Sequence, residues 1–69
     1  MDLRQIIDRF RGVTVTITTT SVAAPFATGE VLDGNLLNNI LAIKLTAAYD
    51  GLPAGATVFF NPAQIVSIG

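Results

Sequence analysis

The sequence predicts a small, mostly β domain in which one short N-terminal helix precedes five short strands. The chain has 69 residues, a length that holds one domain with one core. Its apolar residues follow a helical spacing up to Phe10 and an alternating spacing from Val13 onward. Clusters of glycine, proline and asparagine then divide the rest of the chain into short apolar runs.

The first segment has the pattern of an amphipathic helix over about residues 2–11. The residues at positions i, i+3, i+4 and i+7 of one apolar stripe are Leu3, Ile6, Ile7 and Phe10. Asp2 stands where a side chain caps the first turn, and Gly12 stands where a helix ends. A helix this short is not stable alone in water, so we expect its stripe to pack on a sheet.

Period-two patterns and turn residues predict five strands. Their expected ranges are about 13–19, 26–32, 40–46, 57–60 and 65–68. In the first strand Val13, Val15 and Ile17 alternate with threonine, which suits a pleated surface with one buried face. In the third strand the buried face is expected to carry Leu41, Ile43 and Leu45. Gly29 lies in the middle of the second strand, where a strongly bent strand needs the missing side chain.

Turn residues predict how these strands are connected. Asp33-Gly34-Asn35 is expected to form a tight turn between the second and third strands. Residues 47–56, with three glycine or proline positions, are expected to form a loop. Asn61-Pro62-Ala63-Gln64 is expected to form a single 3₁₀ turn between the last two strands, because proline cannot donate to a strand ladder.

The composition predicts self-association. Charged residues make up 13% of the chain and hydrophobic residues 51%, against roughly 25% charged residues in an average soluble domain. The mean hydropathy is +0.59. So few charges cover a monomer poorly, and we expect much of the surface to be buried against other copies. No run approaches the ~20 apolar residues of a membrane-spanning helix, so we expect no membrane insertion.

Charge argues against a general attraction to nucleic acid, because the net charge is −1 and the isoelectric point is about 4.8. Three of the four cations, however, lie within the first eleven residues, so this end of the chain is locally basic. They are Arg4, Arg9 and Arg11. A solvated helix face is favoured for them over a phosphate-binding patch. The opening residues MDLRQ lack the apolar core of a signal peptide. We therefore expect the protein to be cytoplasmic before it assembles.

The sequence predicts no enzyme, cofactor or metal site. It contains no cysteine and no histidine, so nucleophilic catalysis would depend on scattered carboxylates and Lys44. Glu30, Asp33 and Asn35 supply too few oxygens to hold a hard cation. The glycines at Gly51 and Gly55 lack the lysine and the following helix of a phosphate-binding loop.

Two short motifs add a family resemblance that covers nearly the whole chain. The first consists of Gly29, Asn35, Asn39, Ile40 and Leu41, and the second of Phe59-Phe60, Asn61-Pro62, Ala63-Gln64 and Ile65-Val66. Both resemble the motifs of the Sm-like (LSm/Hfq-type) family of small SH3-like β-barrels. Asn35 departs from the family's aspartate and Asn38 from its bulky apolar residue, while Asn61-Pro62 replaces arginine-glycine.

The resemblance implies a strongly bent, five-stranded antiparallel SH3-like barrel of the Sm type. Sm-like proteins close into homo-oligomeric rings by pairing the fourth strand of one subunit with the fifth of the next. The residues expected at that subunit interface are Val58, Phe59, Phe60, Ile65, Val66 and Ile68. A monomeric barrel, in which the fourth and fifth strands pair within one chain, remains open as the alternative.

The resemblance also implies an RNA site inside the ring, for which the candidate residues are Asn35, Leu37, Asn39, Asn61, Arg4 and Arg9. Without the family's cation at Asn61 we expect weak RNA binding, because phosphate contacts supply most non-specific affinity. For Asn35 and Asn39 a role in holding the turn is favoured over base recognition.

Two functions from different classes follow. The preferred one is a non-enzymatic, self-assembling ring with a structural or scaffold role, and the alternative is an RNA-binding Sm-like ring. The ending of the chain, an aromatic pair, a proline turn and an isoleucine-valine-serine-isoleucine strand, is similar to that of small SH3-like proteins of spore-forming bacteria. A spore or surface structure is therefore one expected setting.

Overall fold

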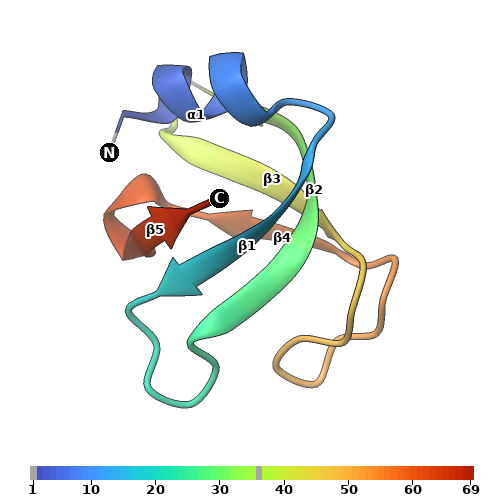
Figure 1. Ribbon diagram of the computed structural model, residues 1–69. Coiled ribbons are helices and arrows are strands. Elements are labelled where there is room, and N and C mark those ends of the chain that lie inside the picture. The colour runs from blue at the N-terminus through green and yellow to red at the C-terminus, as the bar shows by residue number, and fades with distance from the viewer. Residues whose placement is uncertain (1, 36) are drawn as a thin grey trace.

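The computed structural model describes residues 2–35 and 37–69 of the chain. It has one short helix, five strands and a single 3₁₀ turn (Figure 1). In chain order these are α1 (Leu3–Phe10), β1 (Thr14–Thr19), β2 (Phe26–Asn35), β3 (Ile40–Leu45), β4 (Thr57–Phe60), η1 (Pro62–Gln64) and β5 (Ile65–Ile68). The predicted mostly β architecture, with an N-terminal helix before five strands, is confirmed.

The five strands form one antiparallel sheet in the order β4-β3-β2-β1-β5. Within the described residues β4 pairs only with β3, and β5 pairs only with β1. The sheet is therefore not closed into a barrel by hydrogen bonds, because its two edge strands, β4 and β5, do not pair with each other in the described residues. The pairing of the fourth strand with the fifth inside one chain does not occur among these residues.

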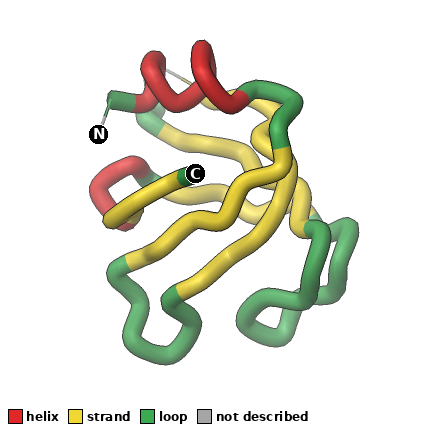
Figure 2. The backbone as a smooth tube through the Cα atoms, in the orientation of Figure 1, coloured by secondary structure: helices red, strands yellow, loops and turns green. Residues whose placement is uncertain are grey.

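The core lies between the inner face of the sheet and α1, which covers one end of the sheet (Figure 2). The buried apolar residues are Leu3, Ile6, Val15, Ile17, Ala27, Val31, Leu41, Ile43, Leu45, Phe60 and Ile65. The predicted inward face of β3 is confirmed. Val13, in contrast, precedes β1 and is 46% exposed, so the alternation of the first strand begins only at Thr14.

Glycines in β2 allow two close approaches. A Cβ atom on Gly29 would lie 2.5 Å from the Lys44 carbonyl oxygen and 2.6 Å from Cγ2 of Ile43, so the neighbouring strand leaves no room for a side chain. A Cβ atom on Gly34 would lie 2.7 Å from Cδ1 of Ile7. The second glycine therefore lets α1 pack directly onto the end of β2.

The expected tight turn at Asp33-Gly34-Asn35 is wrong, because β2 continues through these residues to Asn35. Asp33, Gly34 and Asn35 pair with Ala42, Leu41 and Ile40. The register shifts between Val31 and Asp33, which marks a bulge in the strand. An aspartate-glycine pair favours a turn locally, but here the glycine accommodates the helix.

The other boundaries differ from expectation by one residue at most. The helix begins after Asp2, whose Oδ1 accepts a hydrogen bond from the Arg4 backbone N–H at 3.2 Å. The helix ends before Gly12, which has a φ of 78°. Residues 46–56 connect β3 to β4, and the 3₁₀ turn between β4 and β5 forms where it was predicted.

Candidate functional site

Three strand ends meet at one end of the sheet and bring most of the RNA candidates together. Asn35 pairs with Ile40, and Leu41 pairs with Phe60. Asn61 directly follows Phe60, so it lies at the same end of the sheet as the pair of Asn35 with Ile40. Leu37 and Asn39 lie in the connection between β2 and β3. The tertiary structure thus brings together residues that are distant in the chain. Asn35 and Asn61 are 26 positions apart.

Asn61 holds the turn between the two edge strands. Its Oδ1 accepts a hydrogen bond from the Ala63 backbone N–H at 2.9 Å, while its own N–H donates to Oε1 of Gln64 at 3.0 Å. This reciprocal pair is a capping box, which satisfies two backbone donors at the start of η1. The amide oxygen of Asn61 therefore has a structural partner, although the residue is exposed.

The connection between β2 and β3 presents exposed side chains. Asn39 has a φ of 55°, a left-handed conformation that asparagine tolerates better than most residues. This geometry gives Asn39 a backbone role in reversing the chain. Leu37 is 97% exposed. The side chain of Asn35 lies outside the part of the structure that is described, so only its strand position supports its inclusion in the site.

The arginines differ in their contacts. Arg4 and Arg9 are exposed on α1. Arg11 follows the helix and forms a salt bridge to Asp33, with 3.0 Å between its Nη2 and the Asp33 Oδ2. Both side chains of that pair are largely exposed, which limits its contribution to stability. Arg9 instead places its guanidinium 5.5 Å from the centre of the Phe10 ring, beside the end of β5.

The candidate interface strands divide their apolar side chains between the core and solvent. Phe60 and Ile65 are buried in the core of their own chain, and Val58 and Ile68 pack partly against it. Phe59 is 66% exposed and Val66 is 62% exposed. Only these last two would present a large apolar surface to a neighbouring copy, whereas the others would contribute mainly backbone groups.

Acidic side chains do not gather into a metal site in the described part of the chain. No group of three or more acidic, histidine or cysteine residues lies close enough there to hold an ion. Asp33 is occupied by Arg11 and by the backbone N–H of Gly34. Glu30 lies opposite Lys44 across the β2–β3 pair. Within the same residues, no helix is long and apolar enough to cross a membrane.

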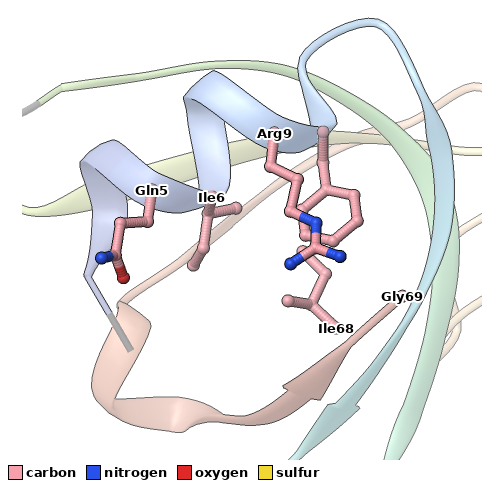
Figure 3. Close-up of a pocket in the computed structure, with 6 residues that line it drawn as sticks. Gln5, Ile6, Arg9, Ile68 and Gly69 are labelled. Atoms are coloured by element: carbon pink, nitrogen blue, oxygen red, sulfur yellow. The ribbon is translucent and has the colours of Figure 1, made fainter.

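One feature was not anticipated from the sequence, a cleft between α1 and the end of β5 (Figure 3). It is lined by Gln5, Ile6, Arg9, Phe10, Ile68 and Gly69. The local signal was the spacing of Gln5 and Arg9, which are four residues apart and so share a helix face. The partner from β5 could not be read from the sequence, because it is about sixty residues away along the chain.

Comparison with known proteins returned nothing: no family model, curated protein or solved structure matches this chain.

Proposed function

We propose that the chain is a non-enzymatic, self-assembling protein with a structural or scaffold role, whose copies join through their sheet edges into a homo-oligomeric, Sm-like ring. In this assembly β4 of one copy pairs with β5 of the next. The observation that carries the proposal is the sheet order, which leaves these two strands as edges.

Neither edge strand has the side chains that usually prevent pairing between molecules. Proteins commonly protect an exposed edge with lysine, other charges or proline. The sequences of β4 and β5 are TVFF and IVSI, and neither contains a charge or a proline. An edge without charges favours pairing with another copy.

Ring closure would also cover apolar surface that one chain leaves in water. Phe59 on β4 and Val66 on β5 are the most exposed apolar side chains of the two edges. A domain of this length buries only about 60% of the surface of its unfolded chain, so added burial stabilises it substantially. In this proposal copies are cytoplasmic before they assemble, and a spore or surface structure is their destination.

The test compares two phenylalanines by native mass spectrometry at micromolar concentration. Phe59 on edge strand β4 and Phe26 on central strand β2 are each 66% exposed. Phe59→Lys places a charge on the edge and is expected to leave a monomer of 7.2 kDa. Phe26→Lys adds the same charge away from the edges and is expected to assemble like the wild type.

A wild-type protein found only as a monomer would reject the proposal. Equal loss of assembly in both variants would also reject it, because the effect would then come from added charge and not from the edge. Negative-stain electron microscopy of the wild type without added RNA supplies the second readout. Rings, filaments or layers are the expected particles.

RNA binding is the second candidate, and the strand register favours it. Asn35 pairs with Ile40, and Asn61 directly follows Phe60, the partner of Leu41, so both asparagines lie at the same end of the sheet. Asn39 directly precedes Ile40 in the chain. Asparagine amides can bond to base edges of single-stranded RNA. Position 61 is an asparagine and not the arginine of the Sm-like motif, so this position supplies no charge to bind phosphate. RNA binding is therefore expected to be weak and sensitive to salt.

A labelled oligonucleotide rich in uridine or adenine tests this second candidate at physiological salt. Asn39→Gly removes the amide while remaining compatible with the φ of 55°, and Arg9→Ala removes a helix cation. Weaker binding by both variants would support an RNA site. Undetectable binding by the wild type would leave self-assembly as the function.

A further inference from the structure

Two aspartate-glycine pairs occur in the chain, Asp33-Gly34 and Asp50-Gly51. An aspartate before glycine is especially reactive, because glycine has no side chain to hinder attack by its own backbone nitrogen on the aspartate carboxyl group. The two pairs have the same acid and the same following residue. A large difference in their reactivity in the folded protein would therefore come from the structure around them.

Asp50-Gly51 forms a chain reversal within the connection between β3 and β4, which extends away from α1 (Figure 1). Tyr49 and Leu52 exchange two backbone hydrogen bonds across it, with N···O distances of 2.9 and 2.8 Å. Asp50 has a φ of 47° and Gly51 a φ of 81°, as both central residues of a type I′ turn require. The pair is thus a two-residue turn on an isolated bridge.

Few contacts hold this turn closed. Asp50 and Gly51 are exposed, and nothing lies within 4 Å of a Cβ atom built on Gly51. In the part of the chain that the structure describes, neither the Asp50 carboxylate nor the Gly51 N–H has a hydrogen-bond or ion-pair partner. A lone two-stranded hairpin is marginally stable in water. The turn therefore opens locally at a small cost in free energy.

Asp33-Gly34 has the opposite surroundings. The Asp33 Oδ1 accepts a hydrogen bond from the Gly34 N–H at 2.8 Å, and its Oδ2 accepts one from Nη2 of Arg11 at 3.0 Å. Gly34 pairs with Leu41 in the sheet, and a Cβ atom on it would lie 2.7 Å from Cδ1 of Ile7. The sheet and the helix must separate here before the Gly34 nitrogen can turn toward the Asp33 carboxyl carbon.

We propose that Asp50-Gly51 is a site of spontaneous isoaspartate formation, and that the fold protects Asp33-Gly34 from the same reaction. The Gly51 nitrogen attacks Cγ of the protonated Asp50 carboxyl group. The amide proton and the carboxyl hydroxyl group leave together as water, and a succinimide ring forms. Water then opens the ring at either carbonyl. One product is aspartate again, and the other is isoaspartate, in which the main chain runs through Cγ and the α-carboxylate is free.

The reaction needs no oxidant, reductant or cofactor, because water leaves in the first step and water is added in the second. The inference goes beyond the proposed assembly and depends only on the fold of one copy. The product has a chemistry that an enzyme can recognise, since isoaspartate methyltransferases transfer a methyl group from S-adenosylmethionine to the free α-carboxylate. Methylation by such an enzyme therefore reports the modified residue.

The test ages the folded protein for weeks at physiological temperature and then digests it with trypsin. Trypsin cleaves after Lys44, so Asp33 and Asp50 fall on different peptides. An isoaspartyl peptide has the same mass as its parent but a different retention time and distinct electron-transfer fragments. We expect it to accumulate from Asp50 at least about tenfold faster than from Asp33, which corresponds to a difference of about 1.4 kcal/mol in the free energy of local opening. Enzymatic methylation is expected on the Asp50 peptide alone.

Two controls separate structure from intrinsic chemistry. Protein aged in guanidinium chloride is unfolded, and both pairs are expected to react there at similar rates. The matched variants Asp50→Asn and Asp33→Asn close the same ring with loss of ammonia. Asparagine before glycine also suits a type I′ turn, so Asp50→Asn is expected to fold normally. Asp50→Asn is expected to deamidate faster than Asp33→Asn in the folded protein.

Three results would overturn the proposal. The first is the absence of isoaspartate at Asp50 in the folded protein under conditions in which the unfolded protein forms it. The second is equal reaction of Asp50 and Asp33 in the folded protein, because the fold would then protect neither pair. The third is a difference between the pairs that persists in guanidinium chloride, since it would then come from the neighbouring sequence.

Discussion

On central strand β3 the large apolar side chains lie on one buried face, whereas edge strands β4 and β5 place apolar side chains on both faces. On β3, Leu41, Ile43 and Leu45 are buried while Lys44 is exposed. On β4, Phe60 is buried and its neighbour Phe59 is 66% exposed. The large apolar side chains of β3 are therefore buried within one chain. The edges retain unpaired backbone and apolar surface, which a second copy could cover.

The largest expected effect is on stability, and it comes from truncating a buried side chain on central strand β3. Ile43 is fully buried, and Ile43→Ala is expected to lower the free energy of unfolding by about 2–5 kcal/mol. Val58 lies directly opposite on edge strand β4 and is only partly buried. Val58→Ala is expected to cost less than half as much in urea unfolding followed by circular dichroism. Equal losses would contradict the distinction between centre and edge.

The next effect concerns the close approach of β2 and β3. Gly29→Ala would place a Cβ atom 2.5 Å from the Lys44 carbonyl oxygen, and backbone cannot yield as a flexible side chain can. We expect a loss of about 1–3 kcal/mol in the free energy of unfolding, measured by urea titration. Gly69→Ala is the control, because nothing lies within 4 Å of its added Cβ. A neutral Gly29→Ala would show that the central strands can separate easily.

A smaller effect is expected at the turn that joins the two edge strands. Asn61→Ala removes the side-chain acceptor for the Ala63 N–H, and loss of such a cap typically costs about 1 kcal/mol. Asn61→Asp keeps an acceptor oxygen and is expected to retain most of the stability. Thermal unfolding of both variants measures the difference. If the two variants lost equal stability, the capping role would be rejected.

The smallest effect on single-chain stability is expected at the edge itself. Phe59→Ser is expected to change the free energy of unfolding by no more than about 0.5 kcal/mol, because Phe59 is largely exposed. The measurement is made by dilute urea titration, below the concentration at which the protein associates. At higher concentration the same variant is expected to associate less than the wild type. A loss above about 1 kcal/mol in the dilute sample would assign Phe59 to the core of its own chain.

Local patterns predicted most of the fold and part of the candidate site. Alternation located β1 and β3, and the run Asn61-Pro62-Ala63-Gln64 predicted the 3₁₀ turn between the last two strands. The capping box that stabilises this turn was seen only in the structure. The misassigned turn at Asp33-Gly34 shows where such reasoning fails. A glycine is found both in chain reversals and at positions where a helix packs closely on a strand, so the local sequence does not distinguish the two. The close approach of Ile7 to Gly34 involves residues far apart in the sequence.

The sequence by itself determined the elements, because helical and alternating periods, caps and turn residues act within a few neighbouring residues. Only the tertiary structure decided which strands became edges. Ile17 pairs with Ile68, which places β5 beside β1, and Leu41 pairs with Phe60, which places β4 beside β3. The same long-range packing sets Arg9 over the end of β5 and forms the cleft. Contacts between distant residues depend on how all the elements fit around one core, which no local pattern encodes.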